Sequence, residues 1–302
     1  MNVGGSDWLA QRFEENRGHL RAVAYRMLGS ASEADDAVQE TWLRLSRADV
    51  SGVENLAGWL TTVAARVCLD MLRARSSRRE EPLEEQAAQS AVMPLRKMDP
   101  EQEAALADAV GGALLVVLDR LEPAERLAFV LHDMFAVSFE EIAPIVGRSE
   151  TAARQLASRA RKRVHGAAGI GGGSGVHLTE QRKIVEGFLG ALRVGDFQGL
   201  LAVLDPDAVV RIDAAAGRPG AGPREVHGAE DWVRGAVAYS QALQTRLVQP
   251  ALVDGRVGLV LASRGRLFRV LRFTFERGKI AQVDIVAEPK NLEKVEVQLL
   301  ED

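Results

Sequence analysis

A glycine-rich segment, GAAGIGGGSG at Gly166–Gly175, constrains the fold of this chain more than any other feature. A segment of this composition acts as a flexible tether, because it offers no side chain that could anchor it in a core. The residues before and after it must therefore fold around separate cores. A chain of 302 residues is long enough to bury more than one.

The apolar pattern differs on the two sides of this tether. Leu9–Leu72 and Leu106–Val164 repeat apolar residues at the spacing of helices, whereas the chain from Val209 onward alternates with the period of strands. Between the helical blocks, EEPLEEQAAQSAVMPLRKMDPEQE is acidic, contains prolines and has little periodicity, which is typical of a linker. We therefore expect two helical domains followed by a mixed α+β domain.

Composition argues against a membrane-spanning or secreted protein. Hydrophobic residues make up 47% of the chain, yet no apolar run approaches the roughly 20 residues of a membrane span. The N-terminus lacks the basic start and apolar stretch of a secretory signal, and the single cysteine, Cys68, has no disulfide partner. These features predict a cytoplasmic protein, with Cys68 as a buried apolar residue. The five histidines lack metal-ligand spacing, so we expect no metal and no cofactor.

The segment Ser138–Val164 contains the starts of two helices. Ser138 and Glu141 have the spacing of a capping box, Gly147 suits the end of the first helix, and Ser149 suits the cap of the second. Two helices joined by so short a turn predict a helix-turn-helix, whose second helix exposes residue types that read a major groove. The alternative is a solvated helix whose terminal arginines and lysine complement its dipole. The candidate reading residues are Ser149, Thr151, Arg154, Gln155, Ser158, Arg159 and Lys162.

An acidic helix is expected after Ser30, where Ser30 and Glu33 offer another capping box. Its exposed side carries like charges, which destabilise a helix by a few tenths of a kcal/mol per pair, so we expect a basic partner surface to face it. The alternative is that the acids complement the helix N-terminus, which does not account for Glu40. This side carries Glu33, Asp36 and Glu40, with Asp35 and Gln39 adjacent, and Trp42 belongs to the buried stripe behind it.

A further helix, over Leu56–Arg73, ends in a cluster of arginines without an acid among them. A phosphate backbone is the natural counter-charge for such a cluster. The chain as a whole has a net charge of −4, so positive charge is confined to local patches. The outward residues of the helix and its end are Thr62, Arg66, Asp70, Arg73, Arg75, Arg78 and Arg79.

Three segments in order resemble an extracytoplasmic-function sigma factor of the sigma-70 family, over Leu20–Val164. They are DDAVQETWLRL, GWLTTVAARVCLDMLR with the arginines after it, and LDRLEPAERLAFVLHDMFAVSFEEIAPIVGRSETAARQLASRARKRV. The resemblance implies a region 2 helical bundle and a region 4 helix-turn-helix. It implies a polymerase subunit that recognises the minus-10 and minus-35 promoter elements and is not an enzyme. Its implied partners are core RNA polymerase, through the β′ and β subunits, and promoter DNA.

The resemblance also implies a role for each surface. The acidic helix, with Asp35, Asp36, Gln39, Glu40 and Trp42, would dock on the β′ coiled coil, and the acidic linker would thread toward the polymerase active centre. The second helix of the helix-turn-helix would read the minus-35 element through the seven residues given above. A factor that acts inside a polymerase complex needs only local basic patches. The implied minus-10 residues are Trp59, Thr62, Arg66, Asp70, Arg73, Arg75, Arg78 and Arg79.

The tail after the tether is similar to the SnoaL-like branch of the NTF2-like superfamily. A helical stretch over Thr179–Leu204 precedes the strand patterns LVQPALVD, VGLVLASRG, LFRVLRFTFERG and KIAQVDIV. The resemblance implies an α+β cone, with helices on one face of a curved sheet, that regulates the sigma domains within the same molecule. Two family motifs are altered here: Asp213 precedes three alanines instead of a glycine run, and the motif before the linker is reduced to Glu81-Pro82-Leu83.

We expect six segments from these observations. They are region 2 at 1–80, the acidic linker at 81–104, region 4 at 105–166, the tether at 167–177, the SnoaL-like domain at 178–288 and a C-terminal tail at 289–302.

Two other functions stay open at this level. NTF2-like cones can enclose a pocket, so Asp213, His227 and Tyr239 are candidates for a small-ligand or regulatory site, or for the acid–base groups of an isomerase or cyclase with a DNA-binding front. Against catalysis, an aspartate before a loop commonly forms a turn, and a fold alone does not confer chemistry. The other alternative is a helix-turn-helix repressor with a ligand-sensing tail, which leaves the acidic helix without a role.

Overall fold

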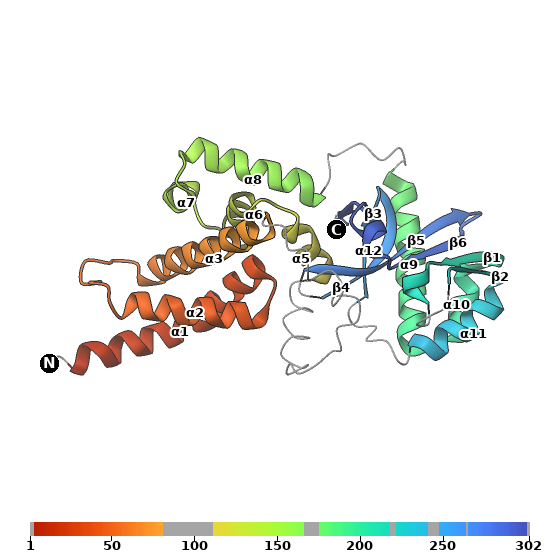
Figure 1. The fold of residues 1–302 in the computed structure, drawn as a ribbon, viewed down its shortest axis with the longest axis horizontal. Helices are drawn as coiled ribbons and strands as arrows, with labels where there is room; N and C mark the ends of the chain where they lie inside the picture. The colour runs from red at the N-terminus through yellow and green to blue at the C-terminus, as the bar shows by residue number, and fades with distance from the viewer. Residues whose placement is uncertain are drawn as a thin grey trace. The chain divides into compact units, whose positions relative to one another are not determined.

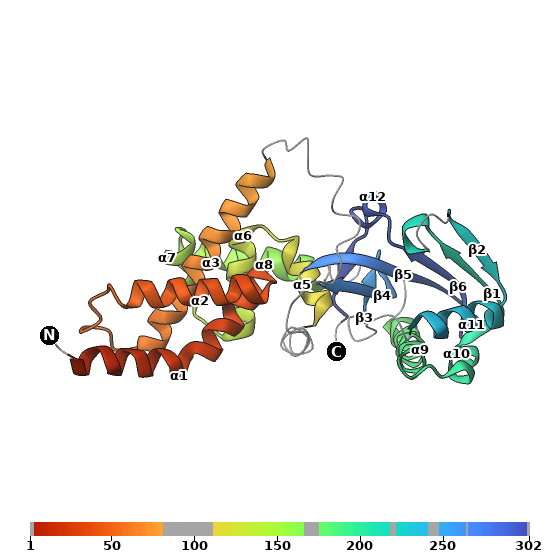
Figure 2. The same ribbon diagram turned by 60° about the horizontal axis from the view of Figure 1, so that its bottom comes forward.

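The computed structural model describes residues 3–80, 111–165, 175–217, 222–240, 248–263 and 265–300 (Figures 1 and 2). They form two compact units. The helical unit contains the described residues up to Glu80 together with Leu118–Arg161, and the C-terminal unit contains Gly111–Val117 and the residues from Lys162 onward. The acidic linker expected at 81–104 lies outside the described residues. Within the described part of the chain, no helix is both long and apolar enough to cross a membrane.

Three helices at the start of the helical unit have ends that follow from local sequence signals. Gly29 ends the first helix with a φ of 73°, and the Ser30 side chain accepts a hydrogen bond from the Glu33 amide to begin the second. Their buried faces meet in a core that includes Phe13 and Leu20. The helices are α1 (Val3–Leu28), α2 (Ala31–Leu45) and α3 (Leu56–Glu80).

The next group of helices contains the predicted helix-turn-helix. Ser138 and Glu141 form a complete capping box at the start of α7, and Gly147 ends that helix with a φ of 68°. Ser149 Oγ then accepts a hydrogen bond from Ala152 N at 3.3 Å and caps α8. These predicted signals are confirmed. The group consists of α5 (Gly112–Asp119), α6 (Pro123–Phe129), the π-helical turn η1 (Val130–Met134), α7 (Phe139–Val146) and α8 (Glu150–His165).

The C-terminal unit is built on a seven-stranded sheet with the order β2-β1-β6-β5-β4-β3-β7. Strands β1 and β6 are parallel, and the other neighbouring pairs are antiparallel. The four strands predicted as a meander are β3 to β6. The strands are β1 (Leu204–Ile212), β2 (Arg224–His227), β3 (Val248–Val253), β4 (Arg256–Ser263), β5 (Arg266–Glu276), β6 (Lys279–Val286) and β7 (Val297–Gln298).

Helices cover one face of this curved sheet (Figure 2). Between helices and sheet, the rings of Phe188 and Trp232 stack with centroids 5.8 Å apart, and Phe273 meets Phe188 edge-on at 5.4 Å. The α+β class expected for the tail is confirmed. Besides most of α5, the helices of this unit are α9 (Gly175–Val194), α10 (Phe197–Val203) and α11 (Ala229–Ser240), and the short α12 (Pro289–Leu292) contacts β5.

Three features of this unit add to the expectation. The helical stretch is divided into two helices, because Gly195 adopts a φ of 71° and Asp196 caps α10 by accepting from Gly199 N at 2.9 Å. Helix α9 already begins at Gly175, inside the expected tether. The sheet is also larger than a meander: β1 inserts parallel to β6, and β7, from the expected C-terminal tail, pairs with β3. Non-local pairings of this kind leave no periodic mark on the sequence.

Candidate nucleic-acid interface

Helix α8 presents the predicted reading residues to solvent. Ala153, Ala157, Ala160 and Val164 are buried, which fixes the rotation of the helix. The opposite side of α8 and its cap carry hydroxyl, amide and basic groups on one continuous surface. All seven predicted residues of this surface are exposed: Ser149, Thr151, Arg154, Gln155, Ser158, Arg159 and Lys162.

Two arginines of this surface are held in place by neighbours. Arg154 donates to the Glu150 carboxylate one turn earlier, and its guanidinium lies 5.4 Å from the centroid of the Phe139 ring. Arg159 Nε donates to Glu125 Oε1 at 2.8 Å, and the Glu125 side chain is only 4% exposed. These three contacts hold both guanidinium groups beside the exposed face of α8. The contacts with Glu125 and Phe139 could not be predicted, because neither follows from spacing along α8.

The acidic side of α2 is partly neutralised within the molecule. Asp35 pairs with Arg21 at 2.6 Å and Glu40 with Arg44 at 3.0 Å. The sequence suggested a basic partner surface that would balance this charge. Because the two ion pairs already neutralise part of it, less charge is left for such a partner. Asp36 and Gln39 remain exposed, and Asp36 makes no ion pair with the described residues.

Trp42, the aromatic residue of the same predicted surface, is half-buried. Its ring packs on Phe13 of α1 with centroids 5.1 Å apart, at an angle of 57°. Part of its role is therefore to join α2 to α1.

Helix α3 brings only part of the predicted minus-10 set to the surface. Arg66, Asp70 and Arg73 are exposed, whereas Trp59 and Thr62 are half-buried. Trp59 packs against the core of the first three helices. The side chains of Arg78 and Arg79 lie outside the described residues, and Arg75 lies 4.0 Å from the Glu33 carboxylate.

Within the helical unit, α3 also contacts α6 and α7. Arg66 Nη2 donates to the carbonyl of Pro144 in α7 at 3.4 Å, and Arg126 Nη1 of α6 donates to the carbonyl of Met27 at 2.8 Å. Arg126 is 3% exposed and also pairs with Asp119 at 3.2 Å. A buried, charge-assisted bond of this kind is strong, so it fixes how the two groups of helices pack.

Phe135 adds an aromatic contact to this packing. Its ring meets His19 edge-on at 5.2 Å, and the Arg26 guanidinium lies 5.2 Å from its centroid. The next residue, Ala136, adopts a φ of 55°, a left-handed conformation that costs a residue with a side chain about 1–2 kcal/mol. The sequence carries no signal for this strained turn.

Burial shifts the pKa of several side chains in the helical unit, and among them it lowers the pKa of Arg26. It also lowers the pKa of His19, whose Nε2 lies 3.2 Å from Thr61 Oγ1. It raises the pKa of the Cys68 thiol to about 12, so the thiolate is scarce at neutral pH. Cys68 is therefore the buried apolar residue that the sequence predicted.

Two of the three candidates in the tail, Asp213 and His227, do not lie in one site. The Asp213 carboxylate accepts hydrogen bonds from the amides of Ala216, Ala287 and Glu288, each at 2.8 Å. This aspartate joins the end of β1 to the segment before α12, and both of its carboxylate oxygens accept hydrogen bonds from backbone amides. His227 is exposed and stands opposite Val209, roughly 13 Å along β1 from Asp213.

The side chain of Tyr239 lies outside the described residues. In the part of the chain that the structure describes, no cluster of His, Cys, Asp and Glu side chains has the geometry to hold a metal ion.

Comparison with known proteins gives matches for both helical groups and for the chain as a whole. The family Sigma-70 region 2 matches residues 12–78, and the family Sigma-70, region 4 matches residues 111–164. The probable ECF RNA polymerase sigma factor SigI of Mycobacterium tuberculosis is 32% identical over 295 residues, which cover 97% of this chain and 98% of that protein. The ECF RNA polymerase sigma factor SigJ of the same organism is 37% identical over 287 residues, covering 92% and 91%. The crystal structure of SigJ covers 94% of this chain and 98% of that chain, with 32% identity and a TM-score of 0.43.

Proposed function

The chain belongs to the extracytoplasmic-function sigma factors of the sigma-70 family, which direct RNA polymerase in promoter-specific transcription initiation, and we propose how its surfaces divide that work. Sigma factors are not enzymes, so this chain acts by binding polymerase and recognising promoter DNA. The observation that supports the division best is the exposed face of α8, where seven polar and basic residues lie on one side of a capped helix.

Helix α8 reads the minus-35 element in the major groove. Arginine and glutamine, the residue types of Arg154 and Gln155, form bidentate hydrogen bonds with base edges. The hydroxyl and lysine side chains of the same face can bind backbone phosphates. The contacts of Arg154 with Glu150 and Phe139 support this role, because a guanidinium whose position is restricted loses less entropy when it binds.

Helix α3 and the arginines at its end read the minus-10 element, with Arg66, Asp70 and Arg73 as the exposed contacts. The acidic side of α2 docks on the β′ subunit of core polymerase, with Asp36 and Gln39 as the residues most open to a partner. The acidic linker expected at 81–104 threads toward the polymerase active centre, where its negative charge can mimic nucleic acid. Since its partners are polymerase and chromosomal DNA, the protein works in the cytoplasm.

The C-terminal domain regulates the sigma regions within the same molecule. The Asp213 carboxylate already accepts three backbone hydrogen bonds, which does not favour a role as the catalytic base of an isomerase or cyclase. If a small ligand binds this domain, it acts by changing the domain's hold on the sigma regions.

The test of the minus-35 assignment is promoter-directed transcription with purified core polymerase. The double variant Arg154→Ala and Gln155→Ala should lower transcription from a cognate promoter by roughly 10- to 1,000-fold, since two base contacts are lost. A matched control is Arg234→Ala with Gln198→Ala, which removes the same residue types from exposed positions of the C-terminal domain. Unchanged transcription in the first variant would show that α8 does not read the promoter.

A further inference from the structure

The first helix of region 4 begins without a capping side chain of its own. Leu115 N bonds to Gly111 O at 3.3 Å, which places Gly111 at the cap position with a φ of 77°. Glycine has no side chain to accept from the free amides of the first turn. The helix itself, GALLVVLD, is almost entirely apolar. Helix α5 therefore needs both a cap and an apolar cover from elsewhere.

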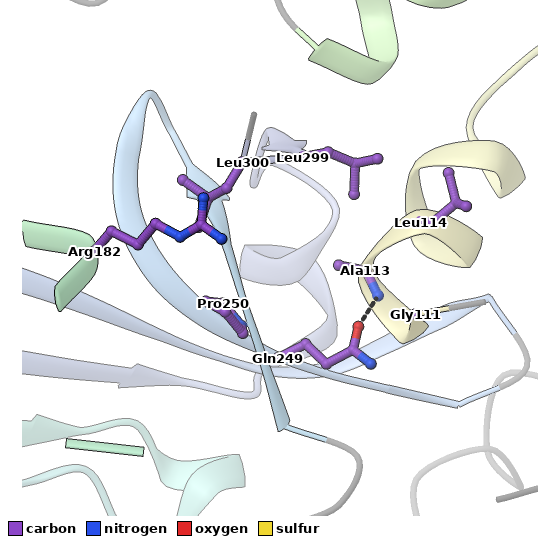
Figure 3. A pocket seen from close by; sticks show the side chains of 8 residues that line it. All are labelled: Gly111, Ala113, Leu114, Arg182, Gln249, Pro250, Leu299 and Leu300. Carbon is purple, nitrogen blue, oxygen red and sulfur yellow. Dashed lines mark hydrogen bonds between the residues drawn. The ribbon is translucent and has the colours of Figure 1, made fainter. Parts of the chain in front are cut away.

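Gln249 on β3 takes the place of the missing cap (Figure 3). Its Oε1 accepts a hydrogen bond from Ala113 N at 3.0 Å. Ala113 is the second residue of α5, and its amide is one that a serine or aspartate cap would serve in an ordinary helix. A Cβ at Gly111 would lie 3.3 Å from the same oxygen, so the glycine also permits the close approach.

The sheet next to Gln249 offers the apolar cover. Gln249, Val260 and Val270 stand in register across β3, β4 and β5, so they share the face of the sheet opposite to the buried Leu259 and Leu271. Val260 and Val270 are both 0% exposed.

The first turn of α5 lies against this face. A Cβ at Gly112 would meet Ala262 Cβ at 4.0 Å, an ordinary packing distance, and Ala113, Val116 and Val117 are buried.

A second bond joins the same domain to the last helix of region 4. Leu299 N donates to Val164 O at 2.8 Å, in the last turn of α8, where carbonyls lack partners within the helix. Leu299 also lines a groove of about 250 Å³ beside Gln249, together with Leu114 and Arg182 (Figure 3). The two bonds thus lie at the two ends of the segment that matches region 4, residues 111–164.

We propose that the C-terminal domain is a docking partner for region 4 within the same chain. It caps α5 through Gln249 and binds the end of α8 through Leu299. Region 4 is then incomplete by itself, because its first helix depends on a side chain more than one hundred residues away. By this docking the C-terminal domain stabilises region 4, which carries the proposed minus-35 surface. This consequence for promoter recognition rests on the proposed function. The bond itself does not depend on that function.

Hydrogen exchange of the full chain, read by mass spectrometry, tests the cap that Gln249 provides. In Gln249→Ala the amides of residues 113–117 should exchange roughly 2- to 30-fold faster, the factor that corresponds to the loss of one N-cap. Gln249→Glu keeps an acceptor oxygen beside the helix N-terminus and should retain the parent's protection. The matched control, Gln198→Ala at an exposed position of α10, should leave α5 unchanged.

A third variant keeps the test decisive if Gln249→Ala loosens the whole domain. Gln249→Leu preserves the side-chain volume and removes only the acceptor, so exchange should rise in α5 and stay at the parent's level in β4. Unchanged exchange of α5 in both the alanine and leucine variants would overturn the proposal, as would a glutamate variant that exchanges as fast as the alanine one. The measurement needs neither polymerase nor DNA, so its outcome is separate from that of the transcription assay.

Discussion

Asp213 is the residue whose chemistry the structure defines most sharply. Three backbone amides donate to its carboxylate, and they belong to two segments more than seventy residues apart. A carboxylate placed this way stabilises the fold, and each bond to a charged acceptor contributes about 1.5–3 kcal/mol.

Asp213→Asn should therefore lower the stability of the C-terminal domain. The new NH₂ group faces amides that can only donate, so we expect a loss of about 1–3 kcal/mol in the free energy of unfolding. Urea unfolding followed by circular dichroism measures it, with Asp207→Asn at an exposed position of β1 as the control. Equal stability of the two variants would mean that the three bonds are not made in solution.

His19 gives the helical unit a dependence on pH. Burial lowers its pKa in the folded state, so between that value and the ordinary value near 6.5 the unfolded chain binds more protons than the folded one. The stability that the neutral ring contributes is complete above about pH 6.5 and is lost as the pH falls through the folded pKa.

We expect His19→Gln to flatten this dependence. Urea unfolding at pH 7, 6 and 5 should show a smaller decrease in the free energy of unfolding for the variant than for the parent. Arg26 contacts the same Phe135 ring as His19. Because arginine keeps its charge over this pH range, its contribution to the free energy of unfolding does not change with pH. Parallel curves for parent and variant would exclude His19 as the group that titrates.

At the scale of elements, the capping box before α7 is the local signal with the clearest energetic weight. Ser138 Oγ accepts from Glu141 N at 3.3 Å, and the Glu141 carboxylate accepts from Ser138 N at 3.1 Å. Ser138→Ala should cost about 0.5–2 kcal/mol of stability in the helical unit. Ser158→Ala, an exposed change inside α8, should stay within about 0.5 kcal/mol of the parent in the same unfolding measurement. A Ser138 variant as stable as the Ser158 variant would contradict the cap.

The elements that could be predicted are those with local signals. The capping box of α7, the left-handed Gly147 and the alternating strands β3 to β6 each depend on residues within a few positions of one another. The strand pairings that could not be predicted join distant parts of the chain. They are the parallel pairing of β1 with β6 and the pairing of β7 with β3. The break between α9 and α10 had a local signal in Gly195 and Asp196 that the helical periodicity outweighed.

The candidate site follows the same division. The exposed face of α8 could be predicted because buried alanines alternate with polar residues at helical spacing. Glu125, which holds Arg159, and Gln249, which caps α5, act across the fold and have no counterpart in sequence spacing. The negative charges of α2 could be predicted from the sequence, but their ion pairs with Arg21 and Arg44, which neutralise part of them, could not.

At the scale of the whole molecule, a chain of net charge −4 carries its positive charge on small surfaces. Such a chain is a weak DNA-binding protein alone, since most of the affinity for DNA comes from phosphate contacts. Its selectivity for promoters must therefore be expressed inside a complex with polymerase, in which, as proposed above, α2 binds the polymerase and α3 and α8 select the promoter.

Binding of the full chain to purified core RNA polymerase tests this claim most directly. We expect a saturable complex that weakens as salt is raised, and roughly tenfold weaker binding for Asp36→Lys on α2 than for Asp207→Lys, its exposed counterpart on β1. The contradicting result is the absence of measurable affinity for core polymerase, both for the full chain and for a chain ending near Gly166.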